Sequence, residues 1–245
     1  MRGEVMISKN KVFKDKLPSH VAIILDGNGT WAKKRGLSRQ AGHKQGALNL
    51  RNITLFCQTL GINYLSVYAF STENWKRPTD EVDYLMGLPK VFEEEFNDAF
   101  DEYDIKVVFT GRRDRLSEDN KALLKRVEED TKHRKGLTLN VGIDYGSQDE
   151  IVRAAGKWSV SNEKAIDTEK FALYLDTAGM PSIDLLIRPG GHMRLSNYML
   201  WQAAYAELYF TKTTWPAFNE KALLKALKSY QKRVRKFGGL KGGGS

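Results

Sequence analysis

Short apolar runs alternate with longer helical patterns along this chain, and this alternation restricts the fold more than any other feature. The runs are rich in β-branched and aromatic residues, and the stronger ones recur about every 30 to 45 residues, the spacing of β-α-β units. We expect strands at Val21–Leu25, Tyr64–Phe70, Ile105–Thr110, Leu137–Ile143 and Ile183–Ile187, with a weaker one at Leu208–Phe210. We expect helices at Gln40–Leu60, Glu81–Tyr103, Glu118–His133, Gln148–Trp158 and Thr168–Leu175, and then a helix in the tail. The pattern predicts an α/β fold with a mainly parallel central sheet covered by helices.

The chain shows no sign of a domain boundary. No change of composition and no long linker rich in Gly, Pro or Ser interrupts the pattern, and no segment repeats. A chain of 245 residues fits within one domain, so we predict a single domain over residues 1–240. Residues 241–245 end in Gly-Gly-Gly-Ser and are typical of a linker or tag.

Composition excludes several classes of protein. Cys57 is the single cysteine, which excludes an internal disulfide framework and a cysteine-rich zinc site. The longest apolar runs, such as Val21–Leu25, fall far short of the ~18 residues of a membrane span. The amino-terminal residues are mixed and charged and show no apolar segment of a secretory signal. We expect a cytoplasmic protein.

The formal net charge of +9 is concentrated near the carboxyl terminus, where residues 219–245 carry eight basic side chains and one acid. Apolar residues there recur every three or four positions, as in an amphipathic helix: Leu223, Leu227, Tyr230, Val234 and Phe237. A solvated face of lysines is the first interpretation, and contact with an anionic membrane surface is the second. Nucleic-acid binding is supported by net charge alone, so we expect no nucleic-acid partner.

Polar clusters that contain glycine or charged residues follow five of the predicted strands. They are Asp26-Gly27-Asn28-Gly29, Ser71-Thr72-Glu73-Asn74-Trp75, Gly111-Arg112-Arg113-Asp114, Asp144-Tyr145-Gly146 and Arg188-Pro189-Gly190-Gly191. In an open parallel sheet the ligand crevice lies outside the carboxyl ends of the strands. If all five clusters reach this edge they predict one binding site, whereas any single cluster is more typical of an ordinary loop.

The first cluster indicates a diphosphate held together with a metal ion. Residues 27–32 match the G-x-G-x-x-[GA] fingerprint of dinucleotide sites, but no acidic residue follows about 20 residues later at the end of a second strand. Asp26 also places a carboxylate where a bare pyrophosphate would bind, so a nicotinamide dehydrogenase is the weaker alternative. A hard cation such as Mg²⁺ between carboxylate and phosphate removes the conflict. The basic residues that follow favour the same ligand: Lys33, Lys34, Arg35, Arg39, His43 and Lys44.

Two further arginines indicate a second anionic site. Arg188 and Arg194 carry guanidinium groups suited to phosphate, and Ser196 adds a hydroxyl donor beside the second. Glu207 ends an otherwise apolar stretch, and such a residue is typical either of a helix cap or surface, or of a second metal ligand.

Longer stretches of the sequence resemble one enzyme family. The stretches are His20–Gly36, which contains Asp26-Gly-Asn-Gly-Thr-Trp31, then Ala41-Gly42-His43, Tyr68–Pro78, Asp184–Arg188, Arg194–Asn197 and Trp201–Pro216. In this order they are similar to the cis-prenyltransferases, and most closely to the branch of bacterial undecaprenyl diphosphate synthases. The resemblance covers nearly the whole chain and implies a single α/β domain, usually a homodimer, with an elongated hydrophobic tunnel.

The resemblance implies an activity and a set of site residues. The activity is condensation of an allylic diphosphate, usually farnesyl diphosphate, with successive isopentenyl diphosphates to form cis double bonds, with Mg²⁺ as cofactor. Asp26 and Asn74 are implied as catalytic, with Asn74 as proton acceptor, and Asp26 and Glu207 as metal ligands. Substrate binding is implied for Gly27, Asn28, Gly29, Thr30, Trp31, Arg39, His43, Ser71, Thr72, Glu73, Trp75, Arg77, Arg188, Arg194, Leu195 and Ser196.

The chain departs from the family pattern at four positions. Thr30 stands where the DGNGRW motif has Arg, His192 replaces a Glu, Asp144 stands where Asn is common, and Lys236 replaces the Arg of a late Arg-x-Gly. Because Thr30 and His192 belong to the expected site, two alternatives stay open. One is a catalytically weakened member that acts as a binding or partner subunit, and the other is a short-chain cis-prenyltransferase.

The acidic segment between residues 73 and 104 is expected to form a wall of the tunnel. Its apolar residues recur at helical spacing: Val82, Leu85, Met86, Pro89, Phe92, Phe96 and Phe100. Spacing alone favours an ordinary core helix, and the resemblance shifts the interpretation toward the tunnel. The small side chain of Ala69 leaves room there for a primer of farnesyl length or longer, which favours a long product.

Overall fold

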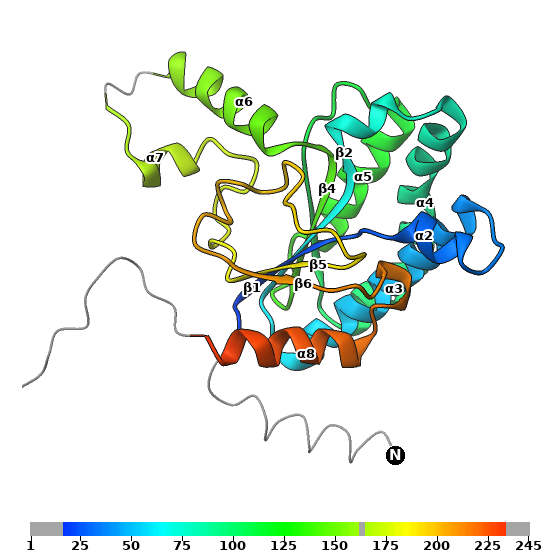
Figure 1. Cartoon of the computed structure of the whole chain (residues 1–245). Helices are drawn as coiled ribbons and strands as arrows, with labels where there is room; N and C mark the ends of the chain where they lie inside the picture. Colours follow the sequence, from blue (N-terminus) through cyan, green and yellow to red (C-terminus); the bar gives the residue numbers. More distant parts are fainter. Residues whose placement is uncertain (1–16, 162–164, 234–245) are drawn as a thin grey trace, which may run out of the picture.

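The computed structural model describes residues 17–161 and 165–233, and within them six strands form one sheet in which every neighbouring pair is parallel (Figure 1). The order across the sheet is β3-β4-β2-β1-β5-β6. The strands are β1 (His20–Ile24), β2 (Tyr64–Ser71), β3 (Lys106–Thr110), β4 (Thr138–Tyr145), β5 (Leu185–Arg188) and β6 (Glu207–Phe210). All six expected strands form, with ends that differ by one or two residues.

The α-helices are α2 (Asn28–Lys33), α3 (Arg39–Leu60), α4 (Thr79–Glu102), α5 (Glu118–Thr131), α6 (Ser147–Ser159), α7 (Thr168–Ala172) and α8 (Glu220–Gln231), and the 3-10 helices are η1 (Thr72–Lys76) and η2 (Trp215–Ala217). The helices α3 to α8 match the expected ones, whereas α2 and η1 occupy clusters that were predicted as loops. Val234 and Phe237 of the expected tail helix, and residues 241–245, lie outside the described residues. No helix in the described ranges is long and apolar enough to cross a membrane.

The two faces of the sheet are covered differently. Alternate strand residues such as Val21 and Ile187 point into a core formed with α3, α4, α5 and α8. The intervening residues, such as Ala22 and Leu186, pack against Tyr198 and its neighbours in the turn-rich segment 195–206. The predicted α/β fold, a parallel sheet flanked by helices, is therefore confirmed, and turns cover much of the second face.

Strand β1 marks a reversal of strand order. Helix α3 leads from β1 to β2 on one side, whereas β5 pairs with the other edge of β1 (Figure 1). In α/β folds such a reversal is where ligands bind, outside the carboxyl ends of the strands. Asp26 follows β1 there, and Arg188 is the last residue of β5.

Two glycines of α3 and one before α2 allow α2 to pack closely against α3 and Thr214. Gly27, the residue before α2, has a left-handed φ of 99°, and a Cβ there would lie 2.9 Å from the side chain of Thr214. A Cβ on Gly42 would lie 2.3 Å from the carbonyl oxygen of Asn28, and one on Gly46 would lie 2.4 Å from Asn28 Oδ1. Because Gly42 and Gly46 are four residues apart on α3, they share one face of the helix and admit the backbone of α2.

This packing predicts that Gly46→Ala lowers the free energy of unfolding by about 1–3 kcal/mol, because the added methyl group has no room beside Asn28 and Trp215. Gly87→Ala is the matched control, since Gly87 lies in α4 with open space around its Cβ position. The control is expected to raise the free energy of unfolding by about 0.5–1 kcal/mol. Urea denaturation measures both, and effects of the same sign and size would contradict the close approach of α2 and α3.

Candidate active site

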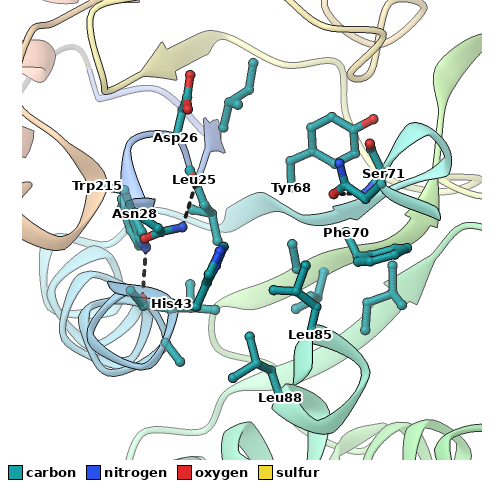
Figure 2. A pocket seen from close by; sticks show the side chains of 18 of the residues that line it. Leu25, Asp26, Asn28, His43, Tyr68, Phe70, Ser71, Leu85, Leu88 and Trp215 are labelled. Atoms are coloured by element: carbon teal, nitrogen blue, oxygen red, sulfur yellow. Dashed lines mark hydrogen bonds between the residues drawn. The ribbon is translucent and has the colours of Figure 1, made fainter. Parts of the chain in front are cut away.

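Two adjoining cavities open at the carboxyl edge of the sheet. The larger has a volume of about 640 Å³ and lies between the sheet and the helices α3 and α4 (Figure 2). The smaller has a volume of about 470 Å³ and lies against α2. The two cavities share five lining residues: Leu25, Asp26, Asn28, His43 and Arg77.

The larger cavity is apolar at one end and polar at the other. Leu85 and Leu88 of α4 lie opposite Asp26 and Ser71 in Figure 2. Further apolar side chains line the first end: Leu50, Pro89, Phe92, Phe109 and Val141. The polar end includes Asn74, Arg188, Arg194 and Ser196. This cavity therefore suits a molecule with a long apolar part and an anionic head.

The smaller cavity is cationic. Besides the shared residues, it is lined by Gly27, Gly29, Thr30, Lys33, Leu37 and Arg39, and Asp26 is the single carboxylate among its lining residues. The amides of Asn28, Gly29 and Thr30 form the first turn of α2, where N–H groups have no partner within the helix. Amides and basic side chains together favour a phosphate ligand. Thr30 is exposed and lies where it can contact such a ligand.

Glu81 holds the basic residues at the boundary between the cavities, and the sequence analysis did not single it out. Its Oε1 atom accepts a hydrogen bond from Arg77 Nη1 at 2.7 Å and lies 3.1 Å from Arg39 Nε and 3.8 Å from His43 Nε2. Arg77 and Glu81 are four residues apart, a spacing at which side chains of opposite charge pair on a helix. This spacing is the feature of the sequence that could have predicted their ion pair.

His43 is neutral in this arrangement. Burial and the charge of Arg77 lower the pKa of His43 to about 4, although Glu81 opposes them. Its Nε2 atom is buried and has no hydrogen-bond partner among the described residues. A neutral imidazole with a free ring nitrogen is available to a ligand in either cavity.

The lowered pKa of His43 predicts how stability depends on pH. The unfolded chain binds a proton at this residue near the ordinary value of 6.5, whereas the folded chain does so only near pH 4. The free energy of unfolding should therefore fall as the pH drops from about 6.5 to about 4, by up to ~1.4 kcal/mol per pH unit from this group. His43→Gln removes that contribution, so urea denaturation across this range should show a shallower slope than wild type. Parallel curves for the two proteins would contradict it.

Asp26 and Arg188 join the ends of β1 and β5. The Arg188 guanidinium donates to Asp26 Oδ2 from Nε at 3.1 Å and from Nη2 at 2.8 Å. Its Nη1 donates to Ser196 Oγ at 2.7 Å and to the carbonyl oxygen of Arg194 at 2.5 Å. Arg188 thereby holds the loop that carries Arg194 and Ser196 beside Asp26.

The turn after β2 forms the opposite side of the polar end. Asn74 Oδ1 accepts a hydrogen bond from the amide of Ser71 at 3.0 Å and so closes a capping box in η1. Asn197 Nδ2 donates to Glu73 Oε1 at 3.0 Å, and Asn197 is a second site residue that the sequence alone did not predict. Burial would raise the pKa of Glu73, but the hydrogen bond from Asn197 and others within the turn hold it below its ordinary value.

A β-bulge turns Ala69 into the larger cavity. In the pairing of β2 with β4, Tyr68 lies opposite Gly142 and Phe70 lies opposite Ile143, so Ala69 is an extra residue. Such a bulge changes the direction of a side chain, and Ala69 lines the cavity as expected. Leu85, Met86, Pro89 and Phe92 of α4 also line it, in agreement with the tunnel interpretation. Val82 and Phe96 are buried in apolar clusters and do not line it, and the side chain of Phe100 lies outside the described residues.

Five of the expected site residues line neither cavity: Trp31, Thr72, Trp75, Leu195 and Glu207. The Trp31 ring lies beside Arg35, whose Cζ atom is 4.3 Å from the ring centroid. Leu195 packs against the apolar cluster on the face of the sheet that segment 195–206 covers. Thr72 lies beside Gly146, where a Cβ would be 2.5 Å from Thr72 Oγ1. Trp75 donates its indole N–H to Asp144 Oδ1 at 2.8 Å.

The expectation that Asp26 and Glu207 share a metal ion is not met within one chain. Glu207 is the first residue of β6 and pairs with Leu185 at the start of β5, whereas Asp26 contacts Arg188 at the end of β5. By the register of β1 with β5, Asp26 lies level with Gly190, five residues beyond Leu185. Because a strand rises about 3.3 Å per residue, the backbones of Asp26 and Glu207 are separated by roughly 16 Å along the sheet. Glu207 instead pairs with Arg233 at 2.6 Å.

The residues around Asp26 fit a magnesium ion that also binds a diphosphate. Arg188 donates only to Oδ2 of Asp26, and Asp26 lines both cavities, so its second carboxylate oxygen is available to a metal ion. Mg²⁺ is commonly held by one or two carboxylates together with substrate phosphates and water. No group of three His, Cys, Asp or Glu residues in the described ranges forms an all-protein metal site. The arrangement therefore suits an ion that enters with the diphosphate.

The fold and the cavities together define an α/β enzyme for an anionic substrate with a long apolar part. Residues 24–238 match the protein family described as "Putative undecaprenyl diphosphate synthase". The chain is 44% identical to an isoprenyl transferase of Bacillus cereus, with 94% of this chain and 92% of the relative covered. It is 47% identical to an isoprenyl transferase of Aquifex aeolicus, with 91% and 96% covered.

Solved structures agree with this family. Lavandulyl diphosphate synthase from Lavandula x intermedia, in complex with dimethylallyl diphosphate, is similar with a TM-score of 0.87 and 37% identity over 91% of this chain and 98% of that one. A "probable undecaprenyl diphosphate synthase" from Campylobacter jejuni is similar with a TM-score of 0.78 and 32% identity, over 91% and 100%. The chain belongs to the undecaprenyl diphosphate synthase family and is a cis-prenyltransferase. The resemblance found in the sequence is confirmed.

Proposed function

We propose that this enzyme condenses farnesyl diphosphate with successive isopentenyl diphosphates in the cis configuration, with Mg²⁺, to a long-chain polyprenyl diphosphate. The observation that carries the proposal is the junction of an apolar cavity and a cationic cavity at Asp26. The allylic chain would occupy the apolar cavity and its diphosphate the smaller one. Arg188, Arg194 and Ser196 would hold the diphosphate of isopentenyl diphosphate.

The volume of the larger cavity supports farnesyl diphosphate as the primer. At ~30 Å³ per non-hydrogen atom, the share of a water in the liquid, about 640 Å³ holds roughly 20 atoms, or about four isoprene units. A farnesyl chain and one added unit fit this space. A longer product requires the wall formed by α4 to move outward, and Pro89 weakens that wall because it has no N–H for the Leu85 carbonyl.

The residues that line the cavities suggest how the enzyme stabilises the charge that develops during the reaction. Negative charge builds on the leaving diphosphate as the allylic carbon–oxygen bond breaks, and bound Mg²⁺ would stabilise it as a Lewis acid. Arg39, Arg77 and the first amides of α2 would stabilise the same charge. An amide is a weak base, and Asn74 Oδ1 already accepts from Ser71. We therefore expect Asn74 to position the proton's acceptor, either water or the released diphosphate.

The proposal is tested by incubating the enzyme with farnesyl diphosphate, labelled isopentenyl diphosphate and Mg²⁺, with and without a chelator. Asp26→Asn keeps an acceptor for Arg188 and removes the carboxylate, so kcat/KM should fall about a thousandfold, as expected for a loss of several kcal/mol. Asp149→Asn is the control, because Asp149 is a half-buried carboxylate that lines neither cavity. Full turnover in chelator, or equal effects of the two variants, would contradict the role of Asp26.

The position of Ala69 predicts an effect on product length. Ala69→Leu adds three carbon atoms to the cavity wall and should shorten the product or slow the later additions, since overpacking typically costs about 1–3 kcal/mol. Ala122→Leu adds the same atoms on an exposed position of α5 and should leave the products unchanged. Chromatography of the labelled products measures the chain length. An unchanged distribution in folded Ala69→Leu would show that the growing chain does not pass this residue.

The two alternatives make different predictions in the same assay. A catalytically weakened partner subunit would bind farnesyl diphosphate without turnover, and its support in the sequence is Thr30 and His192. Thr30 lines the cationic cavity in place of an Arg, whereas His192 lines neither cavity. Lys33 lines the same cavity and supplies a positive charge there. A short-chain enzyme would stop after one or two additions, as the volume of the larger cavity allows.

We also propose that the enzyme is a homodimer in the cytoplasm and that it contacts the membrane surface. Large apolar side chains are exposed on α6 (Val152) and directly after α6 and α7 (Val160 and Leu173). Exposed apolar side chains of this size favour a protein interface. The lysines of α8 (Lys221, Lys225 and Lys228) favour anionic lipid, which a long polyprenyl product would require nearby.

A further inference from the structure

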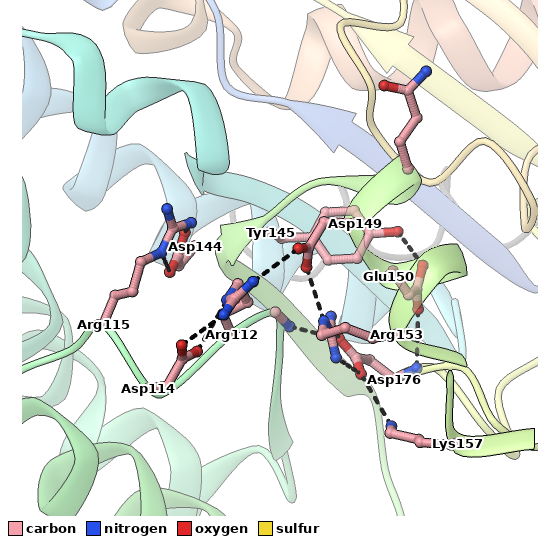
Figure 3. A network of polar contacts seen from close by, with 12 residues as sticks. Arg112, Asp114, Arg115, Asp144, Tyr145, Asp149, Glu150, Arg153, Lys157 and Asp176 are labelled. Atoms are coloured by element: carbon pink, nitrogen blue, oxygen red, sulfur yellow. Dashed lines mark hydrogen bonds and ion pairs between the residues drawn. The ribbon is translucent and has the colours of Figure 1, made fainter. Parts of the chain in front are cut away.

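The loop after β3 (residues 111–114) is one of two polar clusters whose residues line neither cavity, the other being Asp144-Tyr145-Gly146 at the end of β4. The loop was predicted to reach the carboxyl edge of the sheet, and it does, but Arg112 turns toward Asp149 of α6 and Arg115 toward Asp144 of β4 (Figure 3). The amide of Arg112 donates to the carbonyl oxygen of Asp144 at 3.0 Å, and the Arg115 guanidinium binds the Asp144 carboxylate. The loop is therefore attached to the end of β4.

Asp144 is directed toward this loop by a second bulge. In the pairing of β4 with β2, Ile143 lies opposite Phe70 and Tyr145 lies opposite Ser71, which leaves Asp144 without a partner strand residue. Its φ is 50°, in the left-handed region that a side chain other than glycine rarely adopts. Asp144 is fully buried, and both of its carboxylate oxygens accept hydrogen bonds.

Arg115 supplies most of those hydrogen bonds. Its Nε donates to Asp144 Oδ2 at 2.8 Å and its Nη2 donates to Oδ1, a two-pronged contact that fixes the plane of the carboxylate. Oδ1 also accepts the indole N–H of Trp75 at 2.8 Å. The guanidinium lies 5.5 Å from the centroid of the Trp75 ring, so Arg115 contacts this side chain directly as well.

Trp75 connects this pair to the polar end of the larger cavity. It lies in η1, directly after Asn74, and its ring packs edge-on against Phe70 with centroids 5.2 Å apart. Phe70, Ser71, Glu73, Asn74 and Arg77 all line the cavity. Movement of the Trp75 ring would therefore move residues that line the cavity before and after it.

We propose that Arg115 is a positioning residue: by orienting the buried Asp144 carboxylate toward the Trp75 indole, it holds η1 and thereby Asn74 and Arg77 in place. Asp144 stands where the family commonly has Asn, so a charged pair performs this positioning in the present chain. A carboxylate that is fully buried requires a partner such as Arg115, because an unpaired charge there is costly. Only the kinetic part of the test rests on the proposed function.

The kinetic test is a double-mutant cycle between Arg115 and Trp75. Arg115→Met and Trp75→Phe should each lower kcat by about 10- to 100-fold, since small displacements at a reacting centre have effects of this size. In the Trp75→Phe background, Arg115→Met should lower kcat no further, because its effect passes through the indole. Additive effects would overturn the proposal, since a general loss of stability would produce them.

Arg113→Met is the matched control for the loss of an ion pair from the same loop. Arg113 is 36% exposed, close to the 40% of Arg115, and donates to Glu128 at 2.6 Å without touching Trp75. It should change kcat by no more than about twofold. Arg115→Lys is the second variant if Arg115→Met does not fold, because it keeps the charge but not the two-pronged contact. Its kcat should lie between those of wild type and Trp75→Phe.

Trp75 fluorescence supplies a readout that does not need turnover. Subtracting the Trp75→Phe spectrum from that of wild type isolates the emission of Trp75, and the same subtraction is made in the Arg115→Lys and Arg113→Met backgrounds. The emission should shift to longer wavelength with Arg115→Lys and stay in place with Arg113→Met. If the enzyme turns over no substrate, the proposed function fails while this readout still decides the positioning. Equal emission for both backgrounds would overturn the inference.

Discussion

The guanidinium of Arg188 is almost entirely buried, and the Asp26 carboxylate accepts two of its N–H groups. A charge at such a position is stable only with a partner, so the ends of β1 and β5 must stay together. These two strands flank the reversal of strand order, and the apolar and cationic cavities meet at this point. The ion pair that joins these two strands therefore also lies at the boundary between the two cavities.

Local irregularities in the sheet supply the remaining geometry. In a regular strand, side chains alternate between the two faces of the sheet, and this alternation would decide where Ala69 and Asp144 point. The two bulges in the pairing of β2 with β4 interrupt the alternation and change the direction of both side chains. Ala69 then lines the apolar cavity, and Asp144 reaches Trp75 behind the turn that carries Asn74. One distorted strand pair thus shapes both the cavity wall and the support of the polar end.

The amino-acid sequence was sufficient to predict the regular elements and the family. Strands of five to eight residues such as β2 and long helices such as α3 repeat their apolar pattern often enough to be recognised. The short helices α2 and η1 were missed because one or two turns contain no full period, and glycine at positions 27 and 29 favours a loop reading. The cover of the second face by segment 195–206 was missed for a similar reason, since turns have no periodicity.

The sequence by itself determined which chemical groups this enzyme carries: the Asp26 carboxylate, the glycine-flanked amides and the arginines suited to diphosphate. Only the tertiary structure decided which of them meet. It brought Glu81 to the basic residues between the cavities and Asn197 to the larger cavity, and it placed Glu207 at the start of β6, with Arg233. The sequence states the type of each residue, but which residues lie close together depends on strand order, register and bulges. These arise only when all strands of the sheet pair.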